Sequence, residues 1–222
     1  MKLTPEDRAR VGAAVAAAEG NSNGEILTIA TDLSDKYHDV GLHWALVALL
    51  AVLAAGAAWP PLIEAVARLA SGGWHEPSLR ELLTTLMLLA AIKFVSVLLI
   101  LKWMPLRLLL TPGATKSRRV RRRAVELFRV GASQKTIGRT GILVYLSIGE
   151  RRAEIVADEA ILAVTTPETW AGAMDALIAG VKDGRPADGI VAAVALIGAV
   201  LAEHFPKSDT DTNEIPDALI EL

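Results

Sequence analysis

Two long runs without a charged residue constrain the fold of this chain more than any other feature of its sequence. Residues 40–63 contain no Asp, Glu, Lys or Arg. Within them, 42–59 is long enough to cross roughly 30 Å of hydrocarbon as a helix that rises about 1.5 Å per residue. The second run, 82–101, carries a single charge, Lys93. These lengths predict two membrane-spanning helices, since uncharged runs of this length rarely occur in the cores of soluble folds.

The basic residues around the two runs predict their orientation. One Lys or Arg lies in the twenty residues before the first run, two lie between the runs, and six lie in the twenty residues after the second. The positive-inside rule therefore places both chain ends in the cytoplasm. We predict a multi-pass membrane protein with cytoplasmic N- and C-termini. Residues 40–105 would form a two-helix transmembrane hairpin with an outside loop at 60–81.

Lys93 lies near the middle of the second run, where a lysine costs about 3 kcal/mol to insert. It could face its partner helix or a partner subunit. His43 is one candidate neighbour, although the two residues differ in depth. A tolerated polar residue is favoured over a transport role, because two spans with one charge do not form a transport path.

Composition narrows the remaining function classes. The 222 residues carry a net charge of −2, which excludes a strongly basic nucleic-acid binder as a description of the whole chain. The sequence contains no Cys, which excludes disulfides, thiolate metal sites and a Cys nucleophile. The hydrophobic share of 52% is high because of the two runs, and the rest of the chain has the composition of an ordinary soluble domain.

A basic run at 116–123 (KSRRVRRR) follows the second span and predicts contact with anionic lipid headgroups. Clusters of this kind are attracted to anionic headgroups by about 1 kcal/mol per charge. Nucleic-acid binding is disfavoured, because no aromatic residue lies among the arginines to stack on bases. The predicted headgroup contacts are Lys116, Arg118, Arg119, Arg121, Arg122 and Arg123.

The segments outside the hairpin, 1–39 and 106–206, predict one split cytoplasmic domain. Their order is helix, strand, hairpin, helix, strand, strand, helix, helix. A helical crossover makes the first two strands parallel, and a short turn makes the third strand antiparallel to the second. The predicted strands are 25–31, 141–148 and 151–157. The fold class is therefore α/β, a small α/β/α sandwich interrupted by the transmembrane hairpin.

The two segments nearest the C-terminus receive separate predictions. The helix at 188–205 contains an uncharged run at 189–202, which is short for a membrane span and typical of a buried core helix. A third span would also place the acidic end of the chain outside the cell. Residues 207–222 show no strong pattern and are predicted to form a flexible acidic tail.

Three pieces of the cytoplasmic segments resemble the TPM-domain family, also called the TLP18.3/Psb32/MOLO-1 or TPM phosphatase family. Residues 17–26 (AAEGNSNGEI) are similar to the family's helix, turn and GEI strand. Residues 140–158 (TGILVYLSIGERRAEIVAD) are similar to its paired strands that end in Asp, and a third piece runs from Trp170 through Asp188 to Ile190. The inserted hairpin is similar to that of a membrane-anchored bacterial subgroup, and this resemblance implies that the predicted membrane is a bacterial inner membrane.

The resemblance implies an α/β/α sandwich and several activities. Some family members are associated with acid-phosphatase activity or divalent-metal binding, and others with the assembly or maintenance of membrane complexes. The chain departs from the family pattern after Asp158, because Glu159 and Ala160 stand where the family often has Asp-x-Gly.

Carboxylates are the candidate chemical groups, because the four histidines lack metal spacing and the sequence has no phosphate-binding loop or nucleophile motif. The predicted topology brings Glu25, which opens the first strand, and Asp158, which closes the third, to one sheet edge beside Arg139. These three are the candidate catalytic residues, and Glu25, Asp158 and Glu159 are the candidate ligands of Mg²⁺ or Ca²⁺. The alternative is a structural ion pair at the strand ends.

The predicted function is that of a membrane-anchored TPM-like binding or scaffold protein, or a maintenance factor for membrane proteins at the cytoplasmic face. Its partners would be the lipid bilayer, anionic headgroups and a membrane protein, with no nucleic acid. The alternative is a divalent-metal-assisted phosphatase that uses the acidic strand edge.

Overall fold

The computed structural model describes residues 3–131, 140–208 and 218–222. The chain divides into two compact units. The first, called the α/β unit, contains residues up to Asp35 and from Gly113 onward, and the second, called the helical unit, contains Lys36–Pro112.

The α/β unit is built around a mixed four-stranded sheet with the strand order β3-β2-β1-β4. β1 and β2 are parallel and β2 and β3 are antiparallel, which confirms the predicted α/β class and these two pairings. The strands are β1 (Glu25–Thr31), β2 (Gly141–Ser147), β3 (Arg152–Ala157) and β4 (Leu219–Glu221). The helices are α1 (Pro5–Glu19), α6 (Gly113–Gly131), α7 (Glu159–Val164), α8 (Ala171–Lys182) and α9 (Pro186–His204), with a 3-10 helix at Pro167–Trp170.

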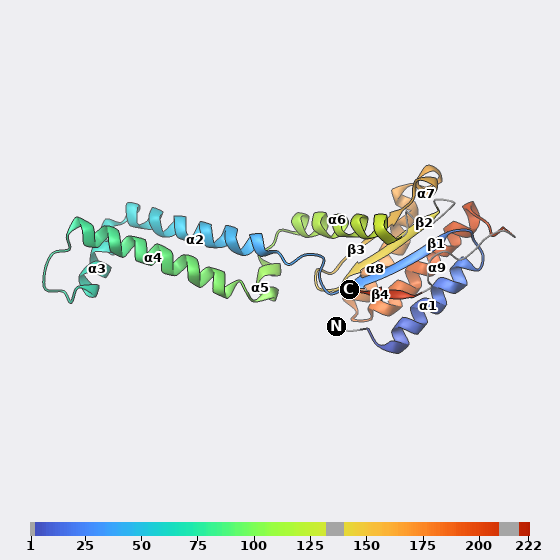
Figure 1. Cartoon of the computed structure of the whole chain (residues 1–222), viewed down its shortest axis with the longest axis horizontal. Coiled ribbons are helices and arrows are strands. Elements are labelled where there is room, and N and C mark those ends of the chain that lie inside the picture. Colours follow the sequence, from blue (N-terminus) through green and yellow to red (C-terminus); the bar gives the residue numbers. More distant parts are fainter. Residues whose placement is uncertain (1–2, 132–139, 209–217) are drawn as a thin grey trace. The chain divides into compact units, whose positions relative to one another are not determined.

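Different helices cover the two faces of the sheet (Figure 1). Side chains alternate along a strand, so neighbouring residues point to opposite faces. Ile26 and Ile142 belong to an apolar cluster with residues of α1, α8 and α9, whereas Leu27 and Tyr145 belong to a second cluster with residues of α6. β1 and β2 are buried along their whole length, as expected for parallel strands covered on both faces.

The structure differs from the three-strand prediction at the end of the chain. Leu219–Glu221, within the predicted flexible tail 207–222, form β4 and pair in parallel with β1. Nε of Arg8 lies 2.6 Å from Oε1 of Glu221, which links this strand to α1. Three residues are too few to show the alternation that predicts a strand. Residues 209–217 of the predicted tail lie outside the described residues.

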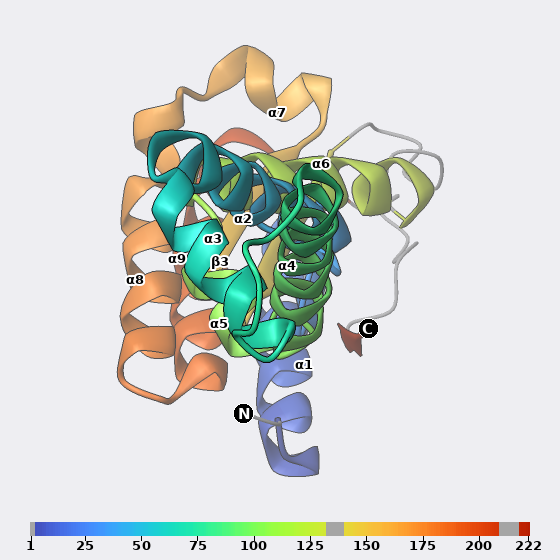
Figure 2. The same cartoon turned by 90° about the vertical axis from the view of Figure 1, so that its left-hand side faces the viewer.

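The helical unit consists of α2 (His38–Ala58), α3 (Pro60–Ala70), α4 (Leu79–Ile100) and α5 (Met104–Leu109). α2 and α4 pack side by side, and α3 contacts both (Figures 1 and 2). Gly56 of α2 permits close packing here, because a Cβ at this position would lie 2.8 Å from Cδ1 of Leu86. The buried Arg107 side chain donates hydrogen bonds of 2.7 Å to the carbonyl oxygens of Leu101 and Lys36. These bonds fix the chain where it enters and leaves the helical unit.

α9 is the third described helix that is long and apolar enough to cross a membrane, but it packs in the core of the α/β unit. Half of its most apolar stretch is buried, compared with 17% for α2 and 6% for α4. Its buried face contacts α1 and α8. This packing agrees with the prediction of a core helix.

Candidate functional site

Glu25 and Asp158 lie at the same edge of the sheet, as the predicted topology requires. Glu25 is opposite Gly141 in the parallel pair β1–β2. The backbone N–H of Gly141 donates to Oδ2 of Asp158 at 3.2 Å, and the N–H of Asp158 donates to the carbonyl oxygen of Gly141 at 2.9 Å. The two acidic residues therefore flank the first residue of β2. Both are buried, with 5% of Glu25 and 7% of Asp158 exposed.

The other residues predicted for this edge do not complete a metal site in the described part of the chain. Glu159 begins α7 and is exposed, and Arg139 lies outside the described residues. Within the described ranges, no three His, Cys, Asp or Glu side chains are placed to hold a metal ion. The Asp158 carboxylate does not cap α7, and instead joins the end of β3 to the start of β2.

The basic run lies on α6, and Arg119 is less exposed than most of the other basic residues in this run. Nη1 of Arg119 lies 3.0 Å from Oδ2 of Asp35, and 18% of the arginine side chain is exposed. Arg119 would have to leave this ion pair to reach a lipid headgroup. Its placement therefore favours a structural role, in which it fixes the segment that follows β1.

The remaining predicted headgroup contacts are spread over the rest of α6. Nη1 of Arg121 lies 3.5 Å from Oε2 of Glu154 on β3, and 72% of the arginine side chain is exposed. An exposed ion pair of this kind contributes little, so Arg121 remains able to exchange partners. Burial is the main cause that raises the pKa of Glu154, and Arg121 partly offsets it. The exposed basic residues of the run are Arg118, Arg121, Arg122 and Arg123, and Lys116 is half-buried.

Sequence reasoning missed a buried polar cluster at the opposite edge, where β1 and β2 end. Glu150 is 6% exposed. Its carboxylate accepts hydrogen bonds from the backbone N–H of Ser34, at 3.0 and 3.2 Å, and from the hydroxyl of Ser147. The hydroxyls of Ser34 and Tyr145 are 2.9 Å apart. Burial raises the pKa of Tyr145, and the hydrogen bond with Ser34 partly opposes this rise.

This cluster joins the loop after β1 to the turn after β2. The predicted strand order could have indicated this cluster, because parallel strands end at the same edge and the polar residues that follow them meet there. Ser34 and Glu150 are far apart in the sequence and form no motif, so only the strand register brings them together.

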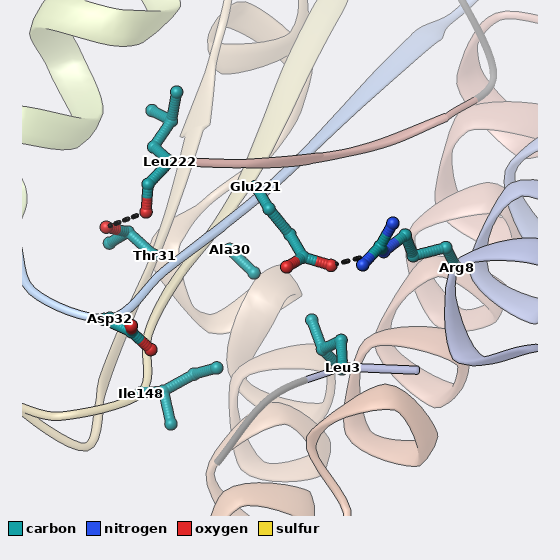
Figure 3. Close-up of a pocket in the computed structure, with 8 residues that line it drawn as sticks. All are labelled: Leu3, Arg8, Ala30, Thr31, Asp32, Ile148, Glu221 and Leu222. Atoms are coloured by element: carbon teal, nitrogen blue, oxygen red, sulfur yellow. Dashed lines mark hydrogen bonds and ion pairs between the residues drawn. The ribbon is translucent and has the colours of Figure 1, made fainter. Parts of the chain in front are cut away.

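A cavity of about 220 Å³ opens near the same strand ends, beside the start of α1 (Figure 3). Leu3 and Ile148 form apolar parts of its lining, and the ion pair between Arg8 and Glu221 forms another part. The Asp32 carboxylate also lines it and makes no hydrogen bond or ion pair with a described residue. Among the described residues that line the cavity, no pair has the geometry of a nucleophile and a base.

α2 and α4 expose large apolar side chains along their lengths, as helices in contact with lipid do. Trp59 and Trp103, which follow the two helices, are 66% and 65% exposed. Tryptophan is enriched at membrane–water interfaces. The large aliphatic side chains that are about half exposed include Leu42, Leu46, Val47 and Leu50 of α2 and Leu83, Met87, Leu88, Ile92, Val95 and Leu99 of α4.

Comparison with known proteins supports the fold and does not identify a family. The chain is similar to the BA42 protein from the psychrophilic bacterium Bizionia argentinensis, whose structure was determined by NMR. The TM-score is 0.57 at 17% sequence identity, and the match covers 100% of this chain and 97% of that one. At this identity the likeness concerns the fold alone. No protein-family model and no curated protein matches the chain.

Proposed function

We propose that α2 and α4 anchor the protein in a membrane and that the α/β unit is a cytoplasmic binding or scaffold domain, or a maintenance factor, for membrane proteins. The observation that carries the anchor is the exposed apolar surface of these two helices. Fully burying one large apolar side chain is worth roughly 1.5–3 kcal/mol, and ten side chains that are each about half exposed together still strongly favour a nonaqueous environment. A bilayer supplies that environment without a protein partner for each helix.

The proposed topology is a transmembrane hairpin with both chain ends in the cytoplasm. The excess of Lys and Arg after the second span supports this orientation. The low internal burial of α2 and α4, beside the half-buried α9, supports two spans rather than three. α3, which follows the first span, would then lie outside.

Contact between α6 and anionic headgroups is the second part of the proposal. α6 begins at Gly113, soon after the second span ends at Ile100, so its basic residues are close to the membrane in sequence. Arg118 is exposed and makes no ion pair with a described residue. Basic residues that are exposed close to a span favour anionic lipid.

A TPM-like assignment of the α/β unit is part of the same proposal. Its support is the resemblance of residues 17–26 and 140–158 to the family's motifs, together with the strand pairing that these segments adopt. A role in assembling or maintaining membrane complexes follows from that resemblance. The fold alone hosts many functions, so the role depends on the anchor and on the partner.

Reporter fusions in living bacteria test the topology. A reporter at Ser71 is expected to report the outside, and reporters in the turn at Gly184 and at the C-terminus are expected to report the cytoplasm. The reporters at Gly184 and at the C-terminus lie before and after α9 in the sequence. An outside C-terminus with an inside Gly184 would make α9 a span, and release of the full chain from membranes by alkaline carbonate would contradict the anchor itself.

A second candidate function, a divalent-metal-assisted phosphatase, is favoured by one observation. Glu25 and Asp158 are both buried beside the first residue of β2, and carboxylate oxygens are the ligands that Mg²⁺ and Ca²⁺ prefer. The proposal is tested on the purified full chain with a generic phosphomonoester, with and without Mg²⁺ or Ca²⁺. Asp158→Asn and Glu25→Gln are expected to remove metal-dependent turnover, whereas Glu203→Gln, at an exposed position of α9, serves as the control. Absence of turnover would contradict a phosphatase, and turnover that is unchanged in both variants would contradict a site at Glu25 and Asp158.

A further inference from the structure

Lys93 is a charged residue without a partner in a helix that the proposed function places in the membrane. Its side chain is exposed on α4, and its ammonium group makes no hydrogen bond or ion pair with a described residue. Lys93 lies eight residues before Leu101, about 12 Å along a helix that rises 1.5 Å per residue. That distance exceeds the reach of a lysine side chain, so Lys93 does not easily place its charge at the cytoplasmic surface.

α2 offers no partner at the depth of Lys93. The segment 45–58 of α2 contains only Ala, Leu, Val and Gly. His43, the neighbour considered from the sequence, lies beside the far end of α4, because a Cβ on nearby Gly41 would lie 3.7 Å from Cβ of Leu101. The helical unit, all of whose residues are described, therefore supplies no partner for the charge of Lys93.

The surroundings of Lys93 form a small polar spot in an apolar surface. Ser96 follows one helical turn later and donates its hydroxyl to the carbonyl oxygen of Ile92 at 2.7 Å. The serine oxygen keeps capacity to accept a second hydrogen bond. Ile92 and Ile100, on either side, are 61% and 57% exposed. The spot therefore presents one ammonium group and one hydroxyl to whatever covers α4.

We propose that Lys93 is the docking point for a membrane helix of another protein that carries a carboxylate at the same depth. This inference rests on the proposed membrane anchor. Charged residues inside a bilayer are usually paired with one another and mark functional contacts. A second copy of this chain does not supply the partner, because neither 40–63 nor 82–101 contains Asp or Glu. A symmetric pair of copies would bring two lysines together instead.

The test uses the full chain in phosphatidylcholine–phosphatidylglycerol vesicles and a synthetic partner helix. The chain has no cysteine, so Ser71→Cys accepts a single fluorescent donor. The probes are acceptor-labelled leucine-rich transmembrane peptides that carry Glu, Gln, Lys or Leu at their centre. Energy transfer is expected to show an association constant about 5- to 30-fold larger for the Glu peptide than for the Leu peptide, the range of polar contacts between membrane helices.

Variants at Lys93 separate pairing from simple hydrophobic association. Lys93→Leu is expected to bind the Glu and Leu peptides equally, and Lys93→Glu is expected to prefer the Lys peptide. Equal affinity of the chain with Lys93 for all four peptides would overturn the inference. This is the result expected if lipid phosphates, and not a protein carboxylate, pair with Lys93. A preference for the Glu peptide that survives in Lys93→Leu would also overturn it.

A flotation measurement distinguishes this failure from failure of the anchor. If the full chain does not float with the vesicles after a carbonate wash, the anchor and the Lys93 inference both fail. If it floats but shows no preference among the peptides, the anchor stands and the Lys93 docking point is wrong.

Discussion

Gly180→Ala tests whether α9 belongs to the core of the α/β unit. Gly180 of α8 meets Gly189 of α9, and a Cβ at position 180 would lie 2.6 Å from Cα and 2.7 Å from N of Gly189. The same Cβ would lie 2.9 Å from the carbonyl oxygen of Arg185. All three are backbone atoms, so the contact is relieved only if one helix moves away from the other.

The expected cost follows from two opposing effects. Overpacking a tight contact costs about 1–3 kcal/mol, and replacing a helical glycine by alanine returns up to about 1 kcal/mol of helix propensity. Because all three clashes are with backbone atoms at 2.6–2.9 Å, the overpacking cost lies at about 2–3 kcal/mol, and Gly180→Ala is expected to lower the free energy of unfolding by about 1–2 kcal/mol. Gly172→Ala on the same helix is the matched control, because its Cβ would meet only Cδ1 of Leu196, at 3.8 Å. That variant is expected to be as stable as the unmodified protein, or slightly more stable.

Pulse proteolysis of the full chain in nanodiscs, across a urea series, measures the stability of the α/β unit without requiring the anchor to unfold. Gly180→Ala is expected to shift the cleavage midpoint to lower urea, and Gly172→Ala is not. Equal midpoints for the two variants would refute the close α8–α9 packing. They would also remove the packing argument against α9 as a third span.

The remaining predictions concern the half-buried carboxylate of Glu154 and the buried carboxylate of Glu150. Burial raises the pKa of Glu154 above its ordinary value, so the folded protein holds this proton to a higher pH than the unfolded chain does and loses stability as the pH rises through the raised pKa. Glu154→Gln is therefore expected to gain stability relative to the unmodified protein between pH 4 and pH 7 in urea unfolding, and a difference that does not vary with pH would contradict this. Glu150→Ala is expected to cost about 2–4 kcal/mol, because Ser34 and Ser147 lose a buried charged acceptor, whereas Glu150→Gln keeps one acceptor oxygen and costs less. Equal urea midpoints for the two Glu150 variants would show that these hydrogen bonds contribute little.

The sequence was sufficient where periodicity and length carry the information. The lengths of the two apolar runs identified α2 and α4, and the crossover helix between the first two strands fixed their parallel pairing. The same reasoning placed Glu25 and Asp158 at one edge, because the two parallel strands begin at that edge and the third strand, antiparallel to the second, ends there. The uncharged run of α9 has 14 residues, which is too short for a typical membrane span, so the sequence predicted a core helix.

Short or distant contacts could not be predicted in the same way. β4 has three residues, too few to show a pattern, and it exists because β1 offers an unpaired edge. Arg119 looks like its basic neighbours in the sequence, and only the position of Asp35 turns it into a structural ion pair.

The sequence by itself determined that this protein has two helices suited to a membrane and an α/β domain split by them, because solvent preference is a property of each segment. The tertiary structure decided which polar groups meet. It brought the Glu150 carboxylate to the backbone N–H of Ser34 and the Asp158 carboxylate to that of Gly141, and it left Lys93 exposed on α4 without a partner among the described residues. Such contacts depend on strand register and helix rotation, which a change of one residue would alter while leaving the composition and hydrophobic pattern almost the same.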